Sequence, residues 1–351
     1  TGFVVGGPGP DWAAEGAGSL LKTTDGGLTW TRQVLDTVAW MDGLDCKSSS
    51  ACWIAGKRGI IQRTQDGGAT WQAAINHLSV KGYLVALRWT GAGNTVLIGA
   101  GSGRILRATD AQNFYPIETG YGTAQWDFDC PAPGVCYSAS SAGSFLASTD
   151  NGATWTRYSA GPEDIVYFGV DCIDGDTCWV AGTDGELRKT GDRGVSWELQ
   201  NSSVPSSVAF NKVRMLDATH GYAAGCEDYD RASETCRGGG AVYRTTDGAT
   251  WTPLRTFAAT ELMDLHVFAM DDVFVVEWSG RVWHYGGAPL DTVTPPATRT
   301  ATPTPTATST ATATPTATWT PTATATPTAT QTPTATHTPT ATPTTGTIAG
   351  L

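Results

Sequence analysis

The chain has 351 residues and a formal net charge of −11, with 22 Lys and Arg residues against 33 Asp and Glu residues. Because it contains no basic run, we expect neither a nucleic-acid partner nor binding to an anionic membrane surface. No apolar run reaches the length that a membrane span needs, so we expect no direct membrane span in this sequence.

The composition divides the chain near residue 291. Residues 291–345 are almost wholly Thr, Ala and Pro, a mixture that cannot bury a core. We therefore predict one large folded domain over residues 1–290, followed by a disordered, extended stalk of the kind found in O-glycosylated spacers. Residues 346–351 leave the stalk pattern and suggest the start of a further, truncated β-domain. Because there is no initiator Met, we also expect the sequence to be a fragment of a longer protein.

The folded part consists of a repeated unit of short strands. The first unit starts at its second strand, Gly2–Gly6, and lacks the innermost strand. The second unit is complete, with strands predicted at Val38–Asp45, Cys52–Gly56 and Gly59–Thr64 and a fourth strand that begins at Thr70. Four antiparallel strands in about 42 residues form a propeller blade. Later units follow the same template.

An octapeptide marks the turn between the third and fourth strands of most units. It reads TTDGGLTW at residues 23–30 and TQDGGATW at residues 64–71. Successive Asp residues of this motif are 40 to 44 positions apart, with one interval of 55, which is typical of a propeller or solenoid. The Asp and Trp residues of the six copies are Asp25, Trp30, Asp66, Trp71, Asp110, Asp150, Trp155, Asp192, Trp197, Asp247 and Trp251.

The octapeptide has a structural explanation. Its Asp carboxylate can accept bonds from the backbone N–H groups of its own turn, and Gly supplies the positive φ that a tight hairpin requires. The Trp then starts the next strand and buries a large ring against a neighbouring unit. A seventh unit, over residues 261–285, lacks the motif. We predict an all-β fold, a seven-bladed propeller of four-stranded antiparallel blades, in which these Asp residues are structural.

The eight cysteines fall into pairs within the repeat. Three pairs share one spacing and one place in the unit, and the fourth pair is wider. This regularity favours local cystines, which indicate an oxidising compartment, over zinc ligands; buried free thiols in a cytosolic protein are the alternative. The predicted pairs are Cys46–Cys52, Cys130–Cys136, Cys172–Cys178 and Cys226–Cys236.

The turn motif, S/T-x-D-x-G-x-T-W, resembles the Asp-box of bacterial neuraminidase (BNR) repeats. With the Trp-x-Ala-Gly of the second strands, the pattern over residues 1–290 resembles the propeller family of photosystem II stability and assembly factors. The resemblance implies a seven-bladed propeller that binds other proteins and does not catalyse. Members with the photosynthetic role depend on a basic surface patch, and this acidic chain shows no obvious counterpart.

The sequence is compatible with two functions. The leading hypothesis is a non-catalytic binding or display module of a secreted or cell-surface bacterial protein, a monomer without a cofactor that recognises a protein or a carbohydrate. The alternative is a glycoside hydrolase of the sialidase or xyloglucanase type. The sequence lacks the Arg-Ile-Pro motif that marks the first arginine of sialidases. Asp42, Asp127 and Asp164 are assigned to innermost strands and are interpreted as solvated or turn-capping residues.

Two loops between second and third strands are much longer than the others, Gly7–Gly16 in the first blade and Cys226–Cys236 in the sixth. Both loops should lie on the face of the propeller opposite the octapeptide turns. Closure of the ring leaves only the seventh blade between them, so we expect them on the same side of that face. Long loops on a rigid scaffold are where binding residues concentrate, although these two could also be tolerated insertions. Their carboxylates and aromatics suit a sugar or a basic peptide, and the second loop could alternatively hold Ca²⁺. The candidate ligand-binding residues are Asp11, Trp12, Glu15, Glu227, Asp228, Tyr229 and Asp230.

Overall fold

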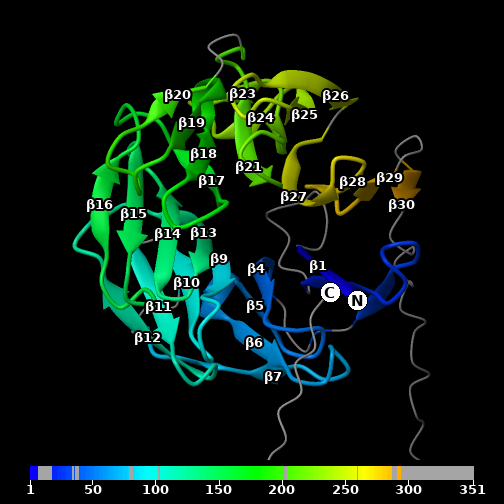
Figure 1. Cartoon of the computed structure of the whole chain (residues 1–351). Coiled ribbons are helices and arrows are strands. Elements are labelled where there is room, and N and C mark those ends of the chain that lie inside the picture. Colours follow the sequence, from blue (N-terminus) through cyan, green and yellow to red (C-terminus); the bar gives the residue numbers. More distant parts are fainter. Residues whose placement is uncertain are drawn as a thin grey trace, which may run out of the picture. The chain divides into compact units, whose positions relative to one another are not determined.

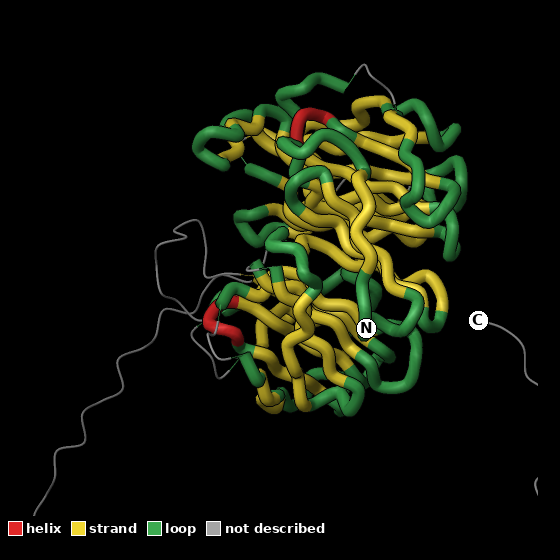
Figure 2. Tube along the Cα trace, turned by 90° about the vertical axis from the view of Figure 1, so that its left-hand side faces the viewer, coloured by secondary structure: helices red, strands yellow, loops and turns green. Residues whose placement is uncertain are grey.

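A computed structural model describes residues 1–6, 18–33, 35, 39–78, 82–101, 103–200, 204–258 and 260–286, and the backbone of residues 291–293. All of these belong to one compact unit, Thr1–Thr298. The described residues form strands and loops, together with two short 3-10 turns, η1 (Lys57–Gly59) and η2 (Thr183–Gly185) (Figure 2). Within these described residues, no helix has the length and apolar character of a membrane span.

Seven antiparallel sheets follow one another around a central axis (Figure 1), which confirms the predicted seven-bladed propeller. Among the described residues, blade 1 comprises β1 (Gly2–Gly6), β2 (Ser19–Thr23) and β3 (Thr31–Gln33). Blade 2 has β4 (Met41–Cys46), β5 (Cys52–Gly56), β6 (Ile61–Thr64) and β7 (Gln72–Ala73). Blade 3 has β9 (Leu84–Trp89), β10 (Val96–Ala100), β11 (Arg104–Ala108) and β12 (Asn113–Glu118), with β8 (Ile75–Asn76) parallel to β12. Blade 4 has β13 (Gln125–Ala132), β14 (Val135–Ser140), β15 (Ser144–Ser148) and β16 (Thr156–Ser159).

The remaining blades repeat this order. Blade 5 has β17 (Tyr167–Cys172), β18 (Cys178–Gly182), β19 (Leu187–Thr190) and β20 (Glu198–Leu199). Blade 6 has β21 (Ala209–Met215), β22 (Gly221–Cys226), β25 (Gly239–Thr245) and β26 (Thr252–Ala258), and a small hairpin of β23 (Tyr229–Asp230) and β24 (Thr235–Cys236) projects between its second and third strands. Blade 7 has β27 (Leu262–Ala269), β28 (Asp272–Glu277), β29 (Val282–Gly286) and β30 (Asp291–Val293). The first strands of blades 2 to 7 lie innermost and contact one another in order (Figure 1).

The core lies between neighbouring blades. The aromatic residue that recurs in the second strand is buried in blades 2, 4, 5 and 6: Trp53 is 4 % exposed, and Tyr137, Trp179 and Tyr222 are at most 1 % exposed. The Trp that closes an octapeptide packs against the preceding blade, as Trp71 does on Phe3 with ring centroids 5.9 Å apart. Each blade interface is therefore a layer of large apolar side chains, the dominant source of stability in such a fold.

The octapeptide turns are held by their own side chains. In blade 2 the buried Thr64 hydroxyl accepts the N–H of Gly68 at 2.8 Å, and the Asp66 carboxylate accepts the N–H and hydroxyl of Thr70 at 2.9 and 2.6 Å. The same bonds recur at residues 23–30, 148–155 and 190–197. These bonds supply the structural role that the sequence suggested for the aspartates.

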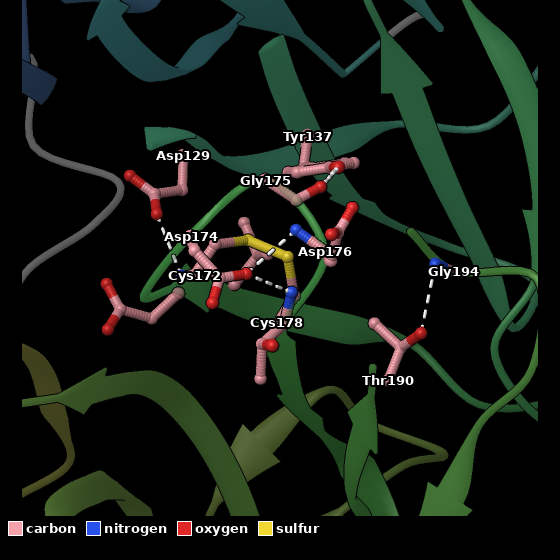
Figure 3. Close-up of a disulfide and its surroundings, with 12 residues drawn as sticks. Asp129, Tyr137, Cys172, Asp174, Gly175, Asp176, Cys178, Thr190 and Gly194 are labelled. Atoms are coloured by element: carbon pink, nitrogen blue, oxygen red, sulfur yellow. Dashed lines mark hydrogen bonds between the residues drawn. A yellow bond between two sulfur atoms is a disulfide. The ribbon is translucent and has the colours of Figure 1, made fainter. Parts of the chain in front are cut away.

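The four cystines join the predicted partners. Three of them link the first strand of a blade to its second strand close to the turn between them, with Cα atoms 4.0 to 4.1 Å apart. Figure 3 shows one of these, Cys172–Cys178, beside Asp129 of blade 4, whose carboxylate accepts the N–H of Cys172 at 2.8 Å. The fourth, Cys226–Cys236, ties the blade 6 hairpin to its own blade.

Candidate functional site: the mouth of the central channel

Each of the six innermost strands contains a β-bulge near its start. In β4, for example, Met41 pairs with Gly56 and Gly43 pairs with Ala55, so that Asp42 has no partner across the sheet. A bulge turns one side chain out of the regular alternation, and bulges are enriched beside functional sites. The bulged residues form what we call the mouth ring, at the end of the channel where the chain enters each blade: Asp42, Val85, Trp126, Phe168, Asn211 and Met263.

One side of the mouth ring is an aromatic arc. The rings of Trp126 and Phe168 meet edge to face with centroids 5.4 Å apart, and Phe168 meets Tyr229 of the blade 6 hairpin in the same way at 6.4 Å. All three side chains are half-buried. Three adjacent blades thus present a continuous apolar surface that remains open to solvent.

The hairpin that supplies Tyr229 is fixed to the scaffold. The N–H of Tyr229 donates to the carbonyl of Ser207 at 2.8 Å. Arg231 reaches over blade 5, where its guanidinium contacts the carboxylates of Asp184 and Asp164 at 2.6 and 3.3 Å. Together with the fourth cystine, these contacts hold the arc in one arrangement, which lowers the entropic cost of binding.

The opposite side of the mouth ring is polar. The Tyr83 hydroxyl donates to Asp42 at 3.0 Å, and the Lys57 ammonium lies 3.8 Å from the ring centroid of Trp40. Protein surrounds the Asp42 carboxyl although water can reach it, and this burial raises its pKa to about 6, against the bond from Tyr83 and the charge of Lys57. Trp278, 38 % exposed, stacks edge to face on Trp40 at 5.5 Å.

Between these two sides lies a third group, from blades 6 and 7. The amide of Asn211 donates to the carboxylate of Glu261 at 2.7 Å and to the carbonyl of Leu262 at 2.8 Å. Burial raises the pKa of Glu261, against the bond from Asn211. The mouth therefore combines half-exposed aromatic rings with two carboxyls whose pKa is raised by burial.

The structure brings only part of the sequence-predicted set to this site. Tyr229 belongs to the aromatic arc, whereas Glu227 and Asp228 are exposed. The Asp230 carboxylate is engaged within the hairpin, by the N–H of Ala232, the Ser233 hydroxyl and Arg237. The described part of the chain contains no group of three or more carboxylate, His or Cys residues arranged to hold a metal ion. The other predicted residues, Asp11, Trp12 and Glu15, lie outside the described residues.

Two of the three axial aspartates need correction. Asp127, interpreted as solvated, is 6 % exposed, and its carboxylate contacts Lys212 at 2.8 Å and Arg214 at 3.6 Å. Asp164 lies in the loop before β17 and not on an innermost strand. Asp42 is on β4, as expected.

Sequence reasoning missed Trp126 and Phe168, the centre of the arc. Both stand at the start of a predicted innermost strand, where the sequence does not show which way the side chain points. No signal in the single sequence marks the bulge, because it is visible only in the pairing between strands.

No family model matches the chain, and no curated protein matches it either. Among solved structures, it is similar to YCF48 from Cyanidioschyzon merolae, with 19 % identity, a TM-score of 0.60, and coverage of 77 % of this chain and 91 % of that one. It is also similar to a YCF48 bound to D1 peptide, with 18 % identity, a TM-score of 0.61, and coverage of 82 % and 96 %. A GH74 xyloglucanase from Xanthomonas campestris matches at 15 % identity and a TM-score of 0.56, with 81 % and 53 % coverage. These likenesses show the fold.

Proposed function

We propose that this propeller is a non-catalytic recognition module that binds a peptide segment of a partner protein at the mouth of its central channel. The aromatic arc of Trp126, Phe168 and Tyr229 carries the proposal. Half-exposed aromatic rings on a rigid frame are the usual anchors of protein interfaces, where a few such residues supply most of the binding energy.

The polar side of the mouth suggests what the ligand carries. Asp42 and Glu261 are acceptors whose carboxyls lie in partly dehydrated surroundings. A peptide that places an apolar side chain on the arc can direct backbone N–H groups or a basic side chain toward these two carboxyls. A basic side chain would bind the ionised form, so its affinity should rise as the pH increases through about 6, the pKa of Asp42.

The similarity to a solved YCF48 bound to D1 peptide supports a peptide ligand by analogy of fold. Four local cystines support a secreted or cell-surface location, where disulfides persist. The Thr- and Pro-rich residues that follow β30 (Asp291–Val293), up to residue 345, would then act as a stalk that displays the propeller.

A glycoside hydrolase is the second candidate, and one observation favours it. A carboxyl with a pKa of about 6, like that of Asp42, can serve as a general acid near neutral pH. A screen of the full chain with chromogenic glycosides addresses this directly. If the wild-type chain cleaves a glycoside and Asp42→Asn does not, the protein is an enzyme and the proposal of a non-catalytic module is wrong.

The binding function is tested by selecting peptides from a displayed random library on the immobilised full chain. Selection on Phe168→Ala serves as the comparison, and Tyr115→Ala serves as the matched control, because Tyr115 is a 55 % exposed aromatic on the outer strand β12. We expect a peptide consensus from the wild type and from Tyr115→Ala, and none from Phe168→Ala. The same consensus from all three proteins would place recognition elsewhere.

A further inference from the structure

A pocket of about 260 Å³ lies between blades 2 and 3. Residues of both octapeptide turns line it, so it opens at the opposite end of the strands from the mouth ring. Trp53, which is 4 % exposed, forms part of its wall. The polar side chains around it include Lys47, Arg63, Asn94 and Asp110. This site is therefore separate from the aromatic arc.

The guanidinium of Arg63 lacks a contact that its equivalent in the next blade makes. Arg63 and Arg107 each precede the Asp of their octapeptide by three positions. The Nε of Arg107 donates to the carbonyl of Asn151, in the turn of blade 4, at 2.9 Å. The carbonyl at the same place in the turn of blade 3 is that of Ala111, and it accepts the indole N–H of Trp53 at 3.0 Å. The Nε of Arg63 is accordingly buried with no acceptor among the described residues.

Arg63 is thus a cation with unused hydrogen-bonding capacity at the wall of a pocket. Within the described part of the chain, its one hydrogen bond runs from Nη2 to the Oε1 atom of Gln112 at 3.1 Å. Buried polar groups in folded proteins almost always have partners, and a group that lacks one calls for an explanation at its site. An acceptor in the pocket would engage the terminal nitrogen atoms of this guanidinium.

Lys47 supplies a second cation to the same pocket. Its ammonium donates to the carbonyl of Gly93 at 2.8 Å and to the Oδ1 atom of Asn94 at 2.9 Å, and it has a further N–H to donate. These bonds join the turns that follow the innermost strands of blades 2 and 3. Between blades 4 and 5 the contact to the corresponding turn is neutral, because the Tyr137 hydroxyl donates to the carbonyl of Gly175 (Figure 3).

The pocket carries a positive charge in an acidic chain. Asp110 is the one carboxylate among the described residues of its lining, and it accepts the N–H groups of Gln112 and Asn113 at 2.9 and 2.7 Å and the Nδ2 atom of Asn113 at 2.6 Å. These bonds lower the pKa of Asp110 to about 2 and hold its carboxylate in its own turn. Lys47 and Arg63 therefore outnumber it, although the chain as a whole has a net charge of −11.

We propose that this pocket, which we call the carboxylate pocket, binds an acidic sugar unit of the uronic acid class. Lys47 and Arg63 would hold the carboxylate by charge-assisted hydrogen bonds. The side-chain amides of Gln65 and Asn94, which also line the pocket, would exchange hydrogen bonds with the ring hydroxyls. The volume is smaller than the roughly 300 to 1,000 Å³ of sites for drug-sized ligands, which favours a single small unit.

The probe is D-glucuronate, titrated into the ¹⁵N-labelled full chain at constant ionic strength and followed by ¹H–¹⁵N correlation spectra. D-Glucose, which has a hydroxymethyl group in place of the carboxylate, is the matched neutral probe. We expect a saturable shift of the Trp53 indole N–H signal with glucuronate and none with glucose. No shift with glucuronate, or equal shifts with both sugars, would overturn the proposal. Tighter binding of N-acetylglutamate would assign the pocket to an acidic protein side chain and would overturn it as well.

Two variants of matched charge locate the site. Lys47→Gln removes one cation from the pocket, whereas Lys189→Gln removes a cation from the position that corresponds to Arg63 in blade 5, where the ammonium lies over the ring of Trp179. We expect about tenfold weaker binding of glucuronate to Lys47→Gln, as for the loss of one hydrogen bond to a charged group, and wild-type affinity for Lys189→Gln. Wild-type affinity for Lys47→Gln, or equal losses in both variants, would contradict the assignment.

A third variant separates this site from the mouth of the channel. Phe168→Ala removes the centre of the aromatic arc, at the other end of the blades, and should bind glucuronate as the wild type does. Loss of glucuronate binding in a folded Phe168→Ala would place the sugar on the aromatic arc and overturn the proposal. Failure of peptide recognition at the arc would leave the result for the carboxylate pocket unchanged.

Discussion

Removing the carboxylate of Asp127 should destabilise the propeller by about 3 kcal/mol. The carboxylate contacts Lys212 at 2.8 Å and Arg214 at 3.6 Å, and the side chains of the three residues are 8, 17 and 20 % exposed. Truncating one partner of a buried ion pair costs about 3 to 5 kcal/mol, because it leaves an uncompensated charge. The two cations retain some contact with water, so we expect the lower end for Asp127→Ala.

The free energy of unfolding from urea titration measures this loss. An exposed ion pair supplies the control: Arg193 and Asp176 are 2.5 Å apart, but their side chains are 63 and 56 % exposed. Asp176→Ala should cost at most about 1 kcal/mol. If Asp127→Ala costs no more than Asp176→Ala, the axial network does not hold the blades together.

The same carboxylate gives a pH dependence with a definite sign. Burial disfavours its ionised form, but Lys212 and Arg214 outweigh burial and hold the pKa of Asp127 below its ordinary value. A lowered pKa in the folded state adds stability above the unfolded pKa and loses it as the pH falls. The stability difference between wild type and Asp127→Asn should therefore shrink below about pH 4. A difference that grows on acidification would refute this reasoning.

Two further predictions concern the turns. Gly27 has φ +90°, and a Cβ atom there would lie 2.4 Å from the ring of Phe274 in blade 7, whereas Gly26 has φ +75° and open space around it. Gly27→Ala should therefore lower the melting temperature more than Gly26→Ala, and equal shifts would argue against contact between blades 1 and 7 at this turn. Thr64→Val leaves the N–H of Gly68 without its acceptor at 2.8 Å. We expect the free energy of unfolding from urea titration to fall by about 1 to 2 kcal/mol. An unchanged free energy of unfolding would contradict this role of Thr64.

Local repeated patterns were sufficient to predict the fold. The side chains of the octapeptide, such as Thr64 and Asp66, form hydrogen bonds with the backbone of its own turn. Each copy in the sequence therefore predicts one turn between the third and fourth strands of a blade. The cystines were predictable for the same reason, because Cys46 and Cys52 face each other across one short hairpin. Both features depend on residues close together in the chain.

The functional site depends on the register between strands and on contacts between blades, which a single sequence does not display. Asp127 was interpreted as solvated because its partners, Lys212 and Arg214, come from a strand two blades away. Phe168 was not singled out because its displacement by a bulge is visible only in the pairing with the next strand. Burial and orientation at the axis are thus properties of the closed ring.

Binding at the mouth of the channel is tested most directly by the affinity of one selected peptide for three proteins. Isothermal titration calorimetry would compare the wild-type chain with Phe168→Ala and with the control Tyr115→Ala. Loss of a central aromatic anchor costs about 1 to 2 kcal/mol or more, so we expect at least about tenfold weaker binding to Phe168→Ala and wild-type affinity for Tyr115→Ala. Equal affinity for all three proteins would contradict recognition by the aromatic arc.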